Sequence, residues 1–504
     1  MNLIAGCLLG LLTLAGEGFL ERVELKLPGR VITVVVADVG GDGQNDLLVF
    51  WRQGYPPDSV SRISVYRSLA GRIDKKPYQV FALPEKTVAF DVGDVDADGR
   101  VDVLLLRSDG VWALPGTPNG KLDKTPRPVV KVMTVAAFPH EDNIPRIRLL
   151  ADLGKDRQGL LIPTVPIGPL ALYTRTDAGK WSLLQLLRVP ARTNLYTSAE
   201  DFRATREYGA LFQITFPRYT IIDQDGDGNS DLLFFSLDSV AVFRAGQDGS
   251  FPAEPNLFRN FNLLESKERI RRGAHVRAVA GDVNGDGRAD LLFNKTVGGI
   301  SNMRSELRLY LANQTSDYPR KPDLVSARDG WGSSVSLIDV NSDKRKDLLR
   351  PHVEMGLTAL IGMMLAGKLE VNFEVYLSKN GSFEDKADIS LPSKLRIDFN
   401  SSQELTGPFP NFATDFNADG IGDLIIGKAG GGSGDNPDRL EIRPGLGQGK
   451  YSDTPIWQTD LNGTRYIMPF RIQPRKPPGL LIYFSNIEDR HGDIWVLHNS
   501  GHWK

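Results

Sequence analysis

The chain has 504 residues, of which 41% are hydrophobic and 24% are charged, and its formal net charge is −2. This composition is typical of a soluble globular protein, and no basic tract supports nucleic-acid binding. Cys7 is the only cysteine, which excludes an internal disulfide.

Residues 1–19 contain an apolar run, residues 3–15, that is too short to span a bilayer. It resembles the core of a signal peptide, with a cleavage site after Ala15. A lipoprotein cleavage box ending at Cys7 and an uncleaved apolar tail are the alternatives. The segment predicts an extracytoplasmic protein, associated with a membrane only if the segment is retained or lipidated.

A nine-residue acidic loop then recurs along the chain, each time followed by a short apolar run such as Leu47-Leu-Val-Phe50. The candidate metal ligands of its six copies are Asp38, Asp42, Gln44 and Asp46; Asp94, Asp96, Asp98, Arg100 and Asp102; Asp223, Asp225, Asp227, Asn229 and Asp231; Asp282, Asn284, Asp286, Arg288 and Asp290; Asp339, Asn341, Asp343, Arg345 and Asp347; and Asp415, Asn417, Asp419, Ile421 and Asp423.

The spacing of the acids predicts calcium binding. Ca²⁺ takes six to eight oxygen ligands, and the loop offers side-chain oxygens at positions 1, 3, 5 and 9. Position 7 varies, which suits a backbone carbonyl ligand. Position 6 is Gly in five copies, where the wrap needs a positive φ, and Lys344 in the other. Gly40 removes the position-3 oxygen of the first loop. We expect about five or six structural Ca²⁺ ions.

Two other structures explain the acidic loop less well than a calcium loop of this kind. An EF-hand closes with Glu at position 12 between helices, so the closing Asp at position 9 and the strand-like flanks exclude it. A metal-free Asp/Asn/Gly turn would account for one copy but poorly for six. Two further copies depart more strongly: residues 152–160 keep two acids but lack the closing one, and residues 472–480 have no acid at the ligand positions, so we expect the last to bind no metal.

The D-x-[DN]-x-D-G-x-x-D-L loop between two strands resembles the FG-GAP/VCBS repeat of integrin-α-type β-propellers. The resemblance covers about residues 20–504. It implies an all-β propeller with calcium in the loops that join the first and second strands of the blades, and it implies no single activity.

The loops begin at residues 38, 94, 152, 223, 282, 339, 415 and about 472. Each interval can hold a blade of four antiparallel strands. The last unit has only three strand patterns, and residues 23–27 form an unpaired one. We therefore predict a single propeller of eight four-stranded blades, closed by the N-terminal strand joining the last blade, with seven blades as the alternative.

Strand alternation places the calcium loops on one face of the ring and all the long insertions on the other. The insertions are residues 51–62, 191–208, 352–369, 392–406 and 427–438. The third has apolar residues at helical spacing: Val353, Leu357, Leu360, Ile361, Met364 and Leu365. We expect a helix there and a binding site for a protein or glycan on this insertion face.

The predicted function is a calcium-stabilised scaffold for adhesion or protein interaction, with a lectin or a polysaccharide lyase as alternatives. No hydrolase, metalloprotease or dinucleotide motif is present, so we assign no catalytic residue and favour a non-enzyme. His352 and His491, with Arg350 nearby, are weak candidates on the insertion face. Trp51, Tyr55, Tyr196, Tyr208 and Trp331 are candidates for stacking on sugars or for packing between blades.

Overall fold

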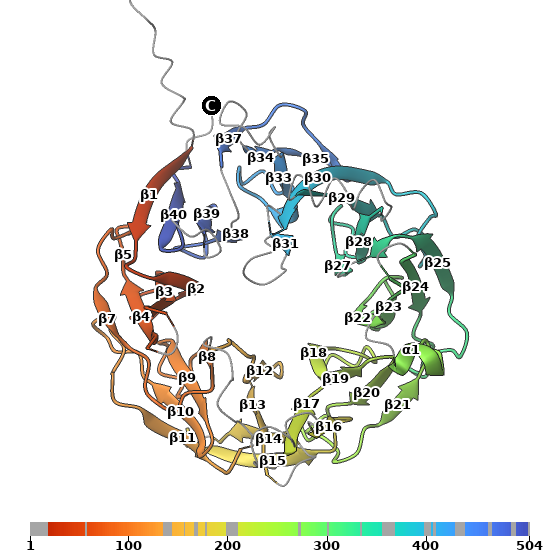
Figure 1. Cartoon of the computed structure of the whole chain (residues 1–504), viewed down its shortest axis with the longest axis horizontal. Coiled ribbons are helices and arrows are strands. Elements are labelled where there is room, and N and C mark those ends of the chain that lie inside the picture. Colours follow the sequence, from red (N-terminus) through yellow and green to blue (C-terminus); the bar gives the residue numbers. More distant parts are fainter. Residues whose placement is uncertain are drawn as a thin grey trace, which may run out of the picture.

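The computed structural model describes residues 19–55, 58–134, 144–155, 157–165, 170–176, 179–197, 210–270, 274–299, 302–332, 335–354, 368–397, 405–406, 410–428, 439–461, 466–484 and 490–501. Eight antiparallel sheets follow one another around a ring, each with its first strand nearest the centre (Figure 1). The prediction of an all-β, eight-bladed propeller is confirmed, and the seven-bladed alternative is wrong.

The first four blades run in chain order from the innermost strand outwards. Blade 1 holds β2 (Arg30–Ala37), β3 (Asp46–Gln53), β4 (Val60–Tyr66) and β7 (Gln79–Ala82); blade 2 holds β8 (Ala89–Gly93), β9 (Asp102–Arg107), β10 (Gly110–Leu114) and β11 (Arg127–Lys131). Blade 3 holds β12 (Leu150–Asp152), β13 (Gln158–Pro163), β14 (Leu170–Arg175) and β15 (Trp181–Leu187); blade 4 holds β18 (Arg218–Ile222), β19 (Asp231–Ser236), β20 (Ser239–Phe243) and β21 (Leu257–Asn260).

Blade 5 holds β22 (His275–Gly281), β23 (Asp290–Val297), β24 (Arg304–Tyr310) and β25 (Leu324–Asp329). In blade 6, β26 (Trp331–Gly332) and β27 (Ser336–Ile338) both pair with β28 (Asp347–Val353), followed by β29 (Lys368–Tyr376), β30 (Ile389–Ile397) and β31 (Leu405–Thr406). Blade 7 holds β32 (Asn411–Thr414), β33 (Asp423–Lys428), β34 (Arg439–Arg443) and β37 (Trp457–Asp460).

Blade 8 closes the ring with strands from both ends of the chain. It holds β38 (Tyr466–Phe470), β39 (Gly479–Tyr483) and β40 (Asp493–Asn499), and its outer strand is β1 (Leu20–Lys26) (Figure 1). β1 pairs antiparallel with β40 along its whole length, from Leu20 opposite Asn499 to Lys26 opposite Asp493. The predicted closure is confirmed, and it gives β40 a partner on its outer edge.

Three short hairpins and one helical turn lie outside the eight blade sheets among the described residues. They are the hairpins β5 (Ser68–Leu69) with β6 (Arg72–Ile73), β16 (Arg192–Thr197) with β17 (Ala210–Thr215) and β35 (Gly445–Gly447) with β36 (Lys450–Tyr451), and the single turn α1 (Ser266–Ile270). No helix among the described residues is long and apolar enough to cross a membrane.

The core lies between neighbouring blades, and the second strands contribute to it along with the first and third strands. In β3, the apolar run after Asp46 is buried on both faces of the sheet, so it alternates between the two seams beside it. Val49 packs towards blade 8, whereas Phe50 stacks on Phe90 of blade 2 with ring centroids 3.9 Å apart. Burial on both faces explains why these runs are continuously hydrophobic.

The predicted helix at residues 352–369 differs at its ends from what the structure shows. Val353 ends strand β28 and Leu369 lies in β29, because both side chains pack into the core of blade 6. Residues 355–367 lie outside the described part of the chain, as do 1–18, 198–209, 398–404 and 429–438, which make up most of the predicted signal segment and much of the other insertions.

Candidate functional site: the acidic loops and a basic pocket

Each of the six acidic loops connects the first strand of a blade to its second, and its position-1 Asp organises the turn. In blade 4, Asp223 Oδ1 accepts the backbone N–H of Gly226 at 2.7 Å, and its Oδ2 accepts that of Gly228 at 2.8 Å. Equivalent bonds from position 6 to position 1 occur in all six loops. Lys344 takes the positive φ of the position-6 glycines, so this cation preserves the backbone shape.

Two loops bring three carboxylates together. One oxygen each of Asp94, Asp96 and Asp102 lie within 4.8 Å of one another, as do those of Asp223, Asp225 and Asp227. Burial, together with the neighbouring acid at position 5, raises the pKa of Asp225, and its buried Oδ1 has no hydrogen-bond partner among the described residues. Converging carboxylates with an unpaired buried oxygen fit a hard divalent cation. The loops at 282, 339 and 415 carry an Asn amide at position 3 instead.

The closing Asp at position 9 has a structural role that the sequence did not indicate. Asp102 is fully buried, and its two oxygens accept the backbone N–H groups of Val95 at 2.9 Å and Gly116 at 2.8 Å. The closing acids of all six loops make the same pair of bonds: Asp46, Asp102, Asp231, Asp290, Asp347 and Asp423. Each therefore ties the acidic loop to the connection between the third and fourth strands.

At position 7 the sequence predicted a ligand from the backbone carbonyl only, but the three arginine side chains there also contact the acid at position 5. Arg100 folds back onto Asp98, and Arg345 forms an ion pair with Asp343 at 2.8 Å. Arg288 lies 3.6 Å from Asp286. These arginines offset part of the negative charge of the position-5 acids, and the backbone carbonyl remains the atom that position 7 would offer to a metal.

Residues 223–293 and 282–349 match the family of FG-GAP-like repeats. This part of the chain consists of FG-GAP-like repeats. The propeller described above fits the same architecture, and three of the six acidic loops, at 223, 282 and 339, lie wholly within the matched residues.

Solved structures similar to the chain are distant. An Agrocybe aegerita lectin described as recognising non-reducing terminal N-acetylglucosamine is 14% identical, with 87% of this chain and 90% of that one covered and a TM-score of 0.37. The V. cholerae biofilm matrix protein Bap1 is 12% identical, with 95% and 89% covered and a TM-score of 0.35. No curated protein sequence matches the chain.

The degenerate repeat of blade 3 has Gly154 and Leu160 at positions 3 and 9, and basic side chains, Lys155 and Arg157, at positions 4 and 6. Its loop is closed by backbone bonds, since Leu153 N–H donates to Arg157 C=O at 2.9 Å and Arg157 N–H donates to Gly154 C=O at 3.0 Å. Lys155 Nζ donates to Asn229 Oδ1 in the FG-GAP-like loop of blade 4 at 2.6 Å. Leu160, at the closing position, is buried in the core.

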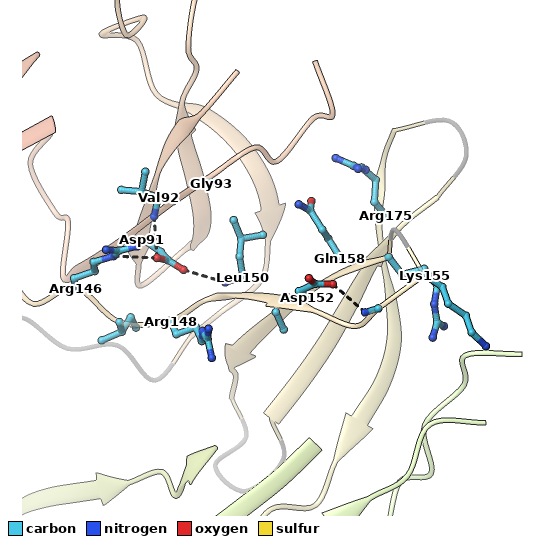
Figure 2. Close-up of a pocket in the computed structure, with 14 residues that line it drawn as sticks. Asp91, Val92, Gly93, Arg146, Arg148, Leu150, Asp152, Lys155, Gln158 and Arg175 are labelled. Atoms are coloured by element: carbon cyan, nitrogen blue, oxygen red, sulfur yellow. Dashed lines mark hydrogen bonds and ion pairs between the residues drawn. The ribbon is translucent and has the colours of Figure 1, made fainter. Parts of the chain in front are cut away.

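A cavity of about 840 Å³ opens between the first strands of blades 2 and 3, next to this degenerate repeat (Figure 2). Its charged and amide lining consists of Asp91, Arg146, Arg148, Asp152, Lys155, Arg157, Gln158 and Arg175. The sequence did not predict this cavity, because its lining residues come from separate stretches of the chain. The only signal was the pair of cations, Lys155 and Arg157, in a loop that is acidic elsewhere.

The histidine candidates of the insertion face receive little support. His352 is buried in β28, where burial lowers its pKa. Arg350 beside it is also buried and donates to Ser305 Oγ at 3.0 Å, while Glu374 accepts Arg328 Nη1 at 2.9 Å and Tyr376 Oη at 2.6 Å. Their side chains form a polar cluster between blades 5 and 6 rather than an open site.

The aromatic candidates divide in the same way. Trp51 is buried and donates its indole N–H to Ser64 Oγ at 2.8 Å, so it packs within a blade. Trp331 is half-buried against the core of blade 6. Tyr55 is 76% exposed and is available to a ligand. The side chains of Tyr196 and Tyr208 lie outside the described part of the chain.

Proposed function

We propose that the protein is an extracytoplasmic, calcium-stabilised propeller that acts as a binding or adhesion scaffold. The observation that carries the calcium part is the convergence of Asp223, Asp225 and Asp227 around an unpaired buried oxygen. The position-1 acid, the position-3 Asp or Asn where the loop has one, the position-5 acid and the position-7 carbonyl are the groups that would hold each ion. The common geometry of the other loops supports the same assignment, with about five or six ions per chain.

Calcium in these loops would support the fold. The loop acids repel one another, and burial raises the pKa of Asp96 and Asp225, so an ion that neutralises them stabilises the folded state. Binding to the native state alone adds about 2.7 kcal/mol of stability when free calcium is a hundred times the dissociation constant. The closing Asp joins each loop to the connection between the third and fourth strands, so an ion in the loop would also stabilise that part of the blade.

Thermal unfolding with calcium and with a chelator tests this part of the proposal. We expect the melting temperature to rise with calcium concentration, and elemental analysis to find several calcium ions per chain. A variant with Asp225→Asn and Asp227→Asn should lose part of the rise, whereas Asp248→Asn, on an exposed turn of the same blade, should keep it. An unchanged melting curve together with no bound calcium would contradict the proposal.

The binding site of the scaffold is proposed on the insertion face. Its support is topological: the connections from β3 to β4, from β28 to β29 and from β33 to β34 all leave the ends of strands opposite the acidic loops. The exposed Tyr55 lies in the first of these connections. We propose a protein or glycan as the partner, with neither nucleic acid nor a membrane involved in its recognition.

A glycan array and an assay for unsaturated sugar products distinguish the alternatives. Glycan binding without products indicates a lectin, and products indicate a polysaccharide lyase. If neither is found, a protein-interaction scaffold remains. A Tyr55→Ala variant that bound the identified partner as well as the parent protein, alongside weakened binding by variants of the acidic-loop face, would refute the assignment to the insertion face.

A further inference from the structure

We propose that the cavity between blades 2 and 3 binds an acidic saccharide, with its basic side chains taking the carboxylate and Gln158 taking a hydroxyl group. The cavity lies on the side of the ring that carries the acidic loops, away from the insertions. The proposal therefore goes beyond the scaffold function, and a partner on the insertion face is not needed for it.

The lining of this cavity is strongly positive. Five basic side chains face two carboxylates among its described residues. One of the two, Asp91, is already saturated: it is buried and accepts the backbone N–H groups of Val92, Leu149 and Leu150 at 2.8–3.1 Å, and Arg146 Nε lies 3.4 Å away (Figure 2). Asp91 thus holds residues 144–150, the segment that leads into β12, against β8, and it offsets only Arg146.

Two polar atoms of the lining lack a partner. Gln158 Oε1 and Arg175 Nη1 are both shielded from solvent, and neither has a hydrogen bond among the described residues. Gln158 begins β13 and Arg175 ends β14, so both are held by the strands of one blade (Figure 2). A buried polar atom without a partner is unfavourable, so a ligand that offers both a donor and an acceptor would satisfy the two.

The chemistry of these groups selects the ligand class. A guanidinium binds a carboxylate through two parallel N–H···O bonds, and Arg148 and Arg175 provide two such groups, neither of which forms an ion pair among the described residues. Gln158 Oε1 accepts only, and therefore requires a hydroxyl or amine donor. A uronic acid carries a carboxylate and several hydroxyl groups on one ring. The cavity volume falls within the range of small-ligand pockets, about 300–1,000 Å³.

The history of the loop is visible in its residues. In this copy position 3 is Gly154 and position 9 is the buried Leu160, and Lys155 and Arg157 stand at positions 4 and 6, where five of the six acidic loops have small residues. Asp152 Oδ1 still accepts the backbone N–H of Gly154 at 2.9 Å, and the backbone bonds from Leu153 to Arg157 and from Arg157 to Gly154 complete the turn. The loop has thus lost two ligand positions of the acidic loops and gained two basic side chains.

Calorimetric titration of the full chain with calcium present tests the proposal. The probes are a galacturonic acid trisaccharide, the neutral galactose trisaccharide and inorganic phosphate. We expect only the acidic trisaccharide to bind, with an affinity that falls as sodium chloride rises. Arg148→Gln combined with Arg175→Gln should weaken binding at least tenfold, and Arg175→Lys, which keeps the charge but not the fork, should weaken it less.

Matched controls separate this site from the fold and from other surfaces. Arg127→Gln removes one positive charge, as each of the two Arg→Gln changes does, but it lies on the outer strand β11, where the side chain is 66% exposed. It should leave the affinity for the trisaccharide unchanged. Arg148 is exposed, so the single variant Arg148→Gln keeps the fold, as its melting temperature should confirm. No binding of the acidic trisaccharide, equal binding of phosphate, or full affinity in the folded double variant would each overturn the proposal, whatever the insertion face binds.

Discussion

The backbone N–H of Val101 donates to the backbone C=O of Asp38 at 2.9 Å, and so joins the acidic loop of blade 2 to that of blade 1. The same kind of backbone bond, from position 8 of one loop to the first or second residue of the loop before it, occurs at four seams: Asn45 to Ile472, Val101 to Asp38, Ala289 to Gln224 and Lys346 to Asp282. At two further seams a strand side chain donates instead, from Trp181 Nε1 to Val95 C=O and from Asn499 Nδ2 to Phe416 C=O. The donor always comes from the following blade. These contacts link the loops into a belt at six of the eight seams.

Side chains reinforce this belt in a way that is visible in the sequence. Position 4 is Gly in the loops at 38, 223 and 282, and in each case the next loop has Arg at position 7. A methyl group added at Gly41 would lie 2.8 Å from Arg100 Cγ, and at Gly285 3.3 Å from Arg345 Cγ. Where the next loop lacks this Arg, position 4 is Ala97, Ser342 or Ala418.

The first prediction compares two glycines of one loop. Gly41→Ala should destabilise the protein more than Gly43→Ala, by about 1 kcal/mol or more in a denaturant titration. Both residues have positive φ, so both changes carry the backbone cost, but only the methyl at Gly41 meets Arg100. Arg100→Ala should remove the difference. Equal losses from the two glycine variants would mean that the loops do not press on one another.

The second prediction concerns the closing Asp. Asp102→Asn should reduce the free energy of unfolding by about 2–4 kcal/mol, because an amide nitrogen would face one of the two backbone N–H donors in a buried site. Asp109→Asn, at a half-exposed ion pair of the same blade, should cost less than about 1 kcal/mol. A similar small loss at Asp102 would show that its bonds to Val95 and Gly116 are dispensable.

The third prediction concerns the polar cluster between blades 5 and 6. Glu374→Gln should destabilise the protein by about 3 kcal/mol or more, because Arg328 and the buried Arg350 would lose their nearest carboxylate. The exposed pair of Arg188 with Glu254 supplies the control, and Glu254→Gln should cost at most about 1 kcal/mol. Chemical denaturation of both variants decides, and comparable losses would refute the role given to Glu374.

The fourth prediction is a dependence on pH. Burial, and secondarily Arg72, lowers the pKa of His498 from 6.5 to about 4. Between these values the unfolded chain binds a proton that the folded chain does not, so this contribution to stability is complete above pH 6.5 and is lost as pH falls towards 4. The loss is on the order of 3 kcal/mol.

His498→Gln isolates this contribution from the carboxylates that titrate in the same range. The Gln side chain can accept the Ile73 N–H that His498 Nε2 now accepts at 3.4 Å, and it does not titrate. The stability difference between parent and variant, measured by denaturation from pH 7 to pH 4, should shift in favour of the variant as the pH falls. A constant difference would contradict the prediction.

The sequence predicted the blades well because each repeat carries its own local signal. An Asp-rich turn followed by a buried apolar run defines the first two strands, and Asp46, Asp231 and Asp290 all begin a second strand as expected. The unpaired strand pattern at residues 23–27 predicted the closure because every other repeat already had four strands. The predicted helix was wrong at Val353, because alternation on a strand and spacing on a helix can both bury the same residue.

The sequence could not predict contacts that depend on how blades meet. The bond from Lys155 to Asn229 links residues of two repeats, and nothing in either repeat alone indicates it. The cavity beside Asp91 likewise forms only because residues 144–149, which lead into β12, lie against β8. The role of Arg at position 7 was missed for the same reason, although its pairing with Gly at position 4 of the preceding loop was available in the printed sequence.

The closure of blade 8 also determines how the ring would respond to mechanical force. Leu20, the first residue of β1, and Asn499, the last residue of β40, face each other at one end of the β1–β40 ladder, and Lys26 and Asp493 face each other at the far end. Tension between the two ends would therefore load one residue pair at a time and peel the strands apart, instead of shearing all the pairs together. A propeller pulled from another blade would resist until that blade separated from its neighbours. One pulled by the ends of β1 and β40 would instead lose the hydrogen bonds between these two strands in succession.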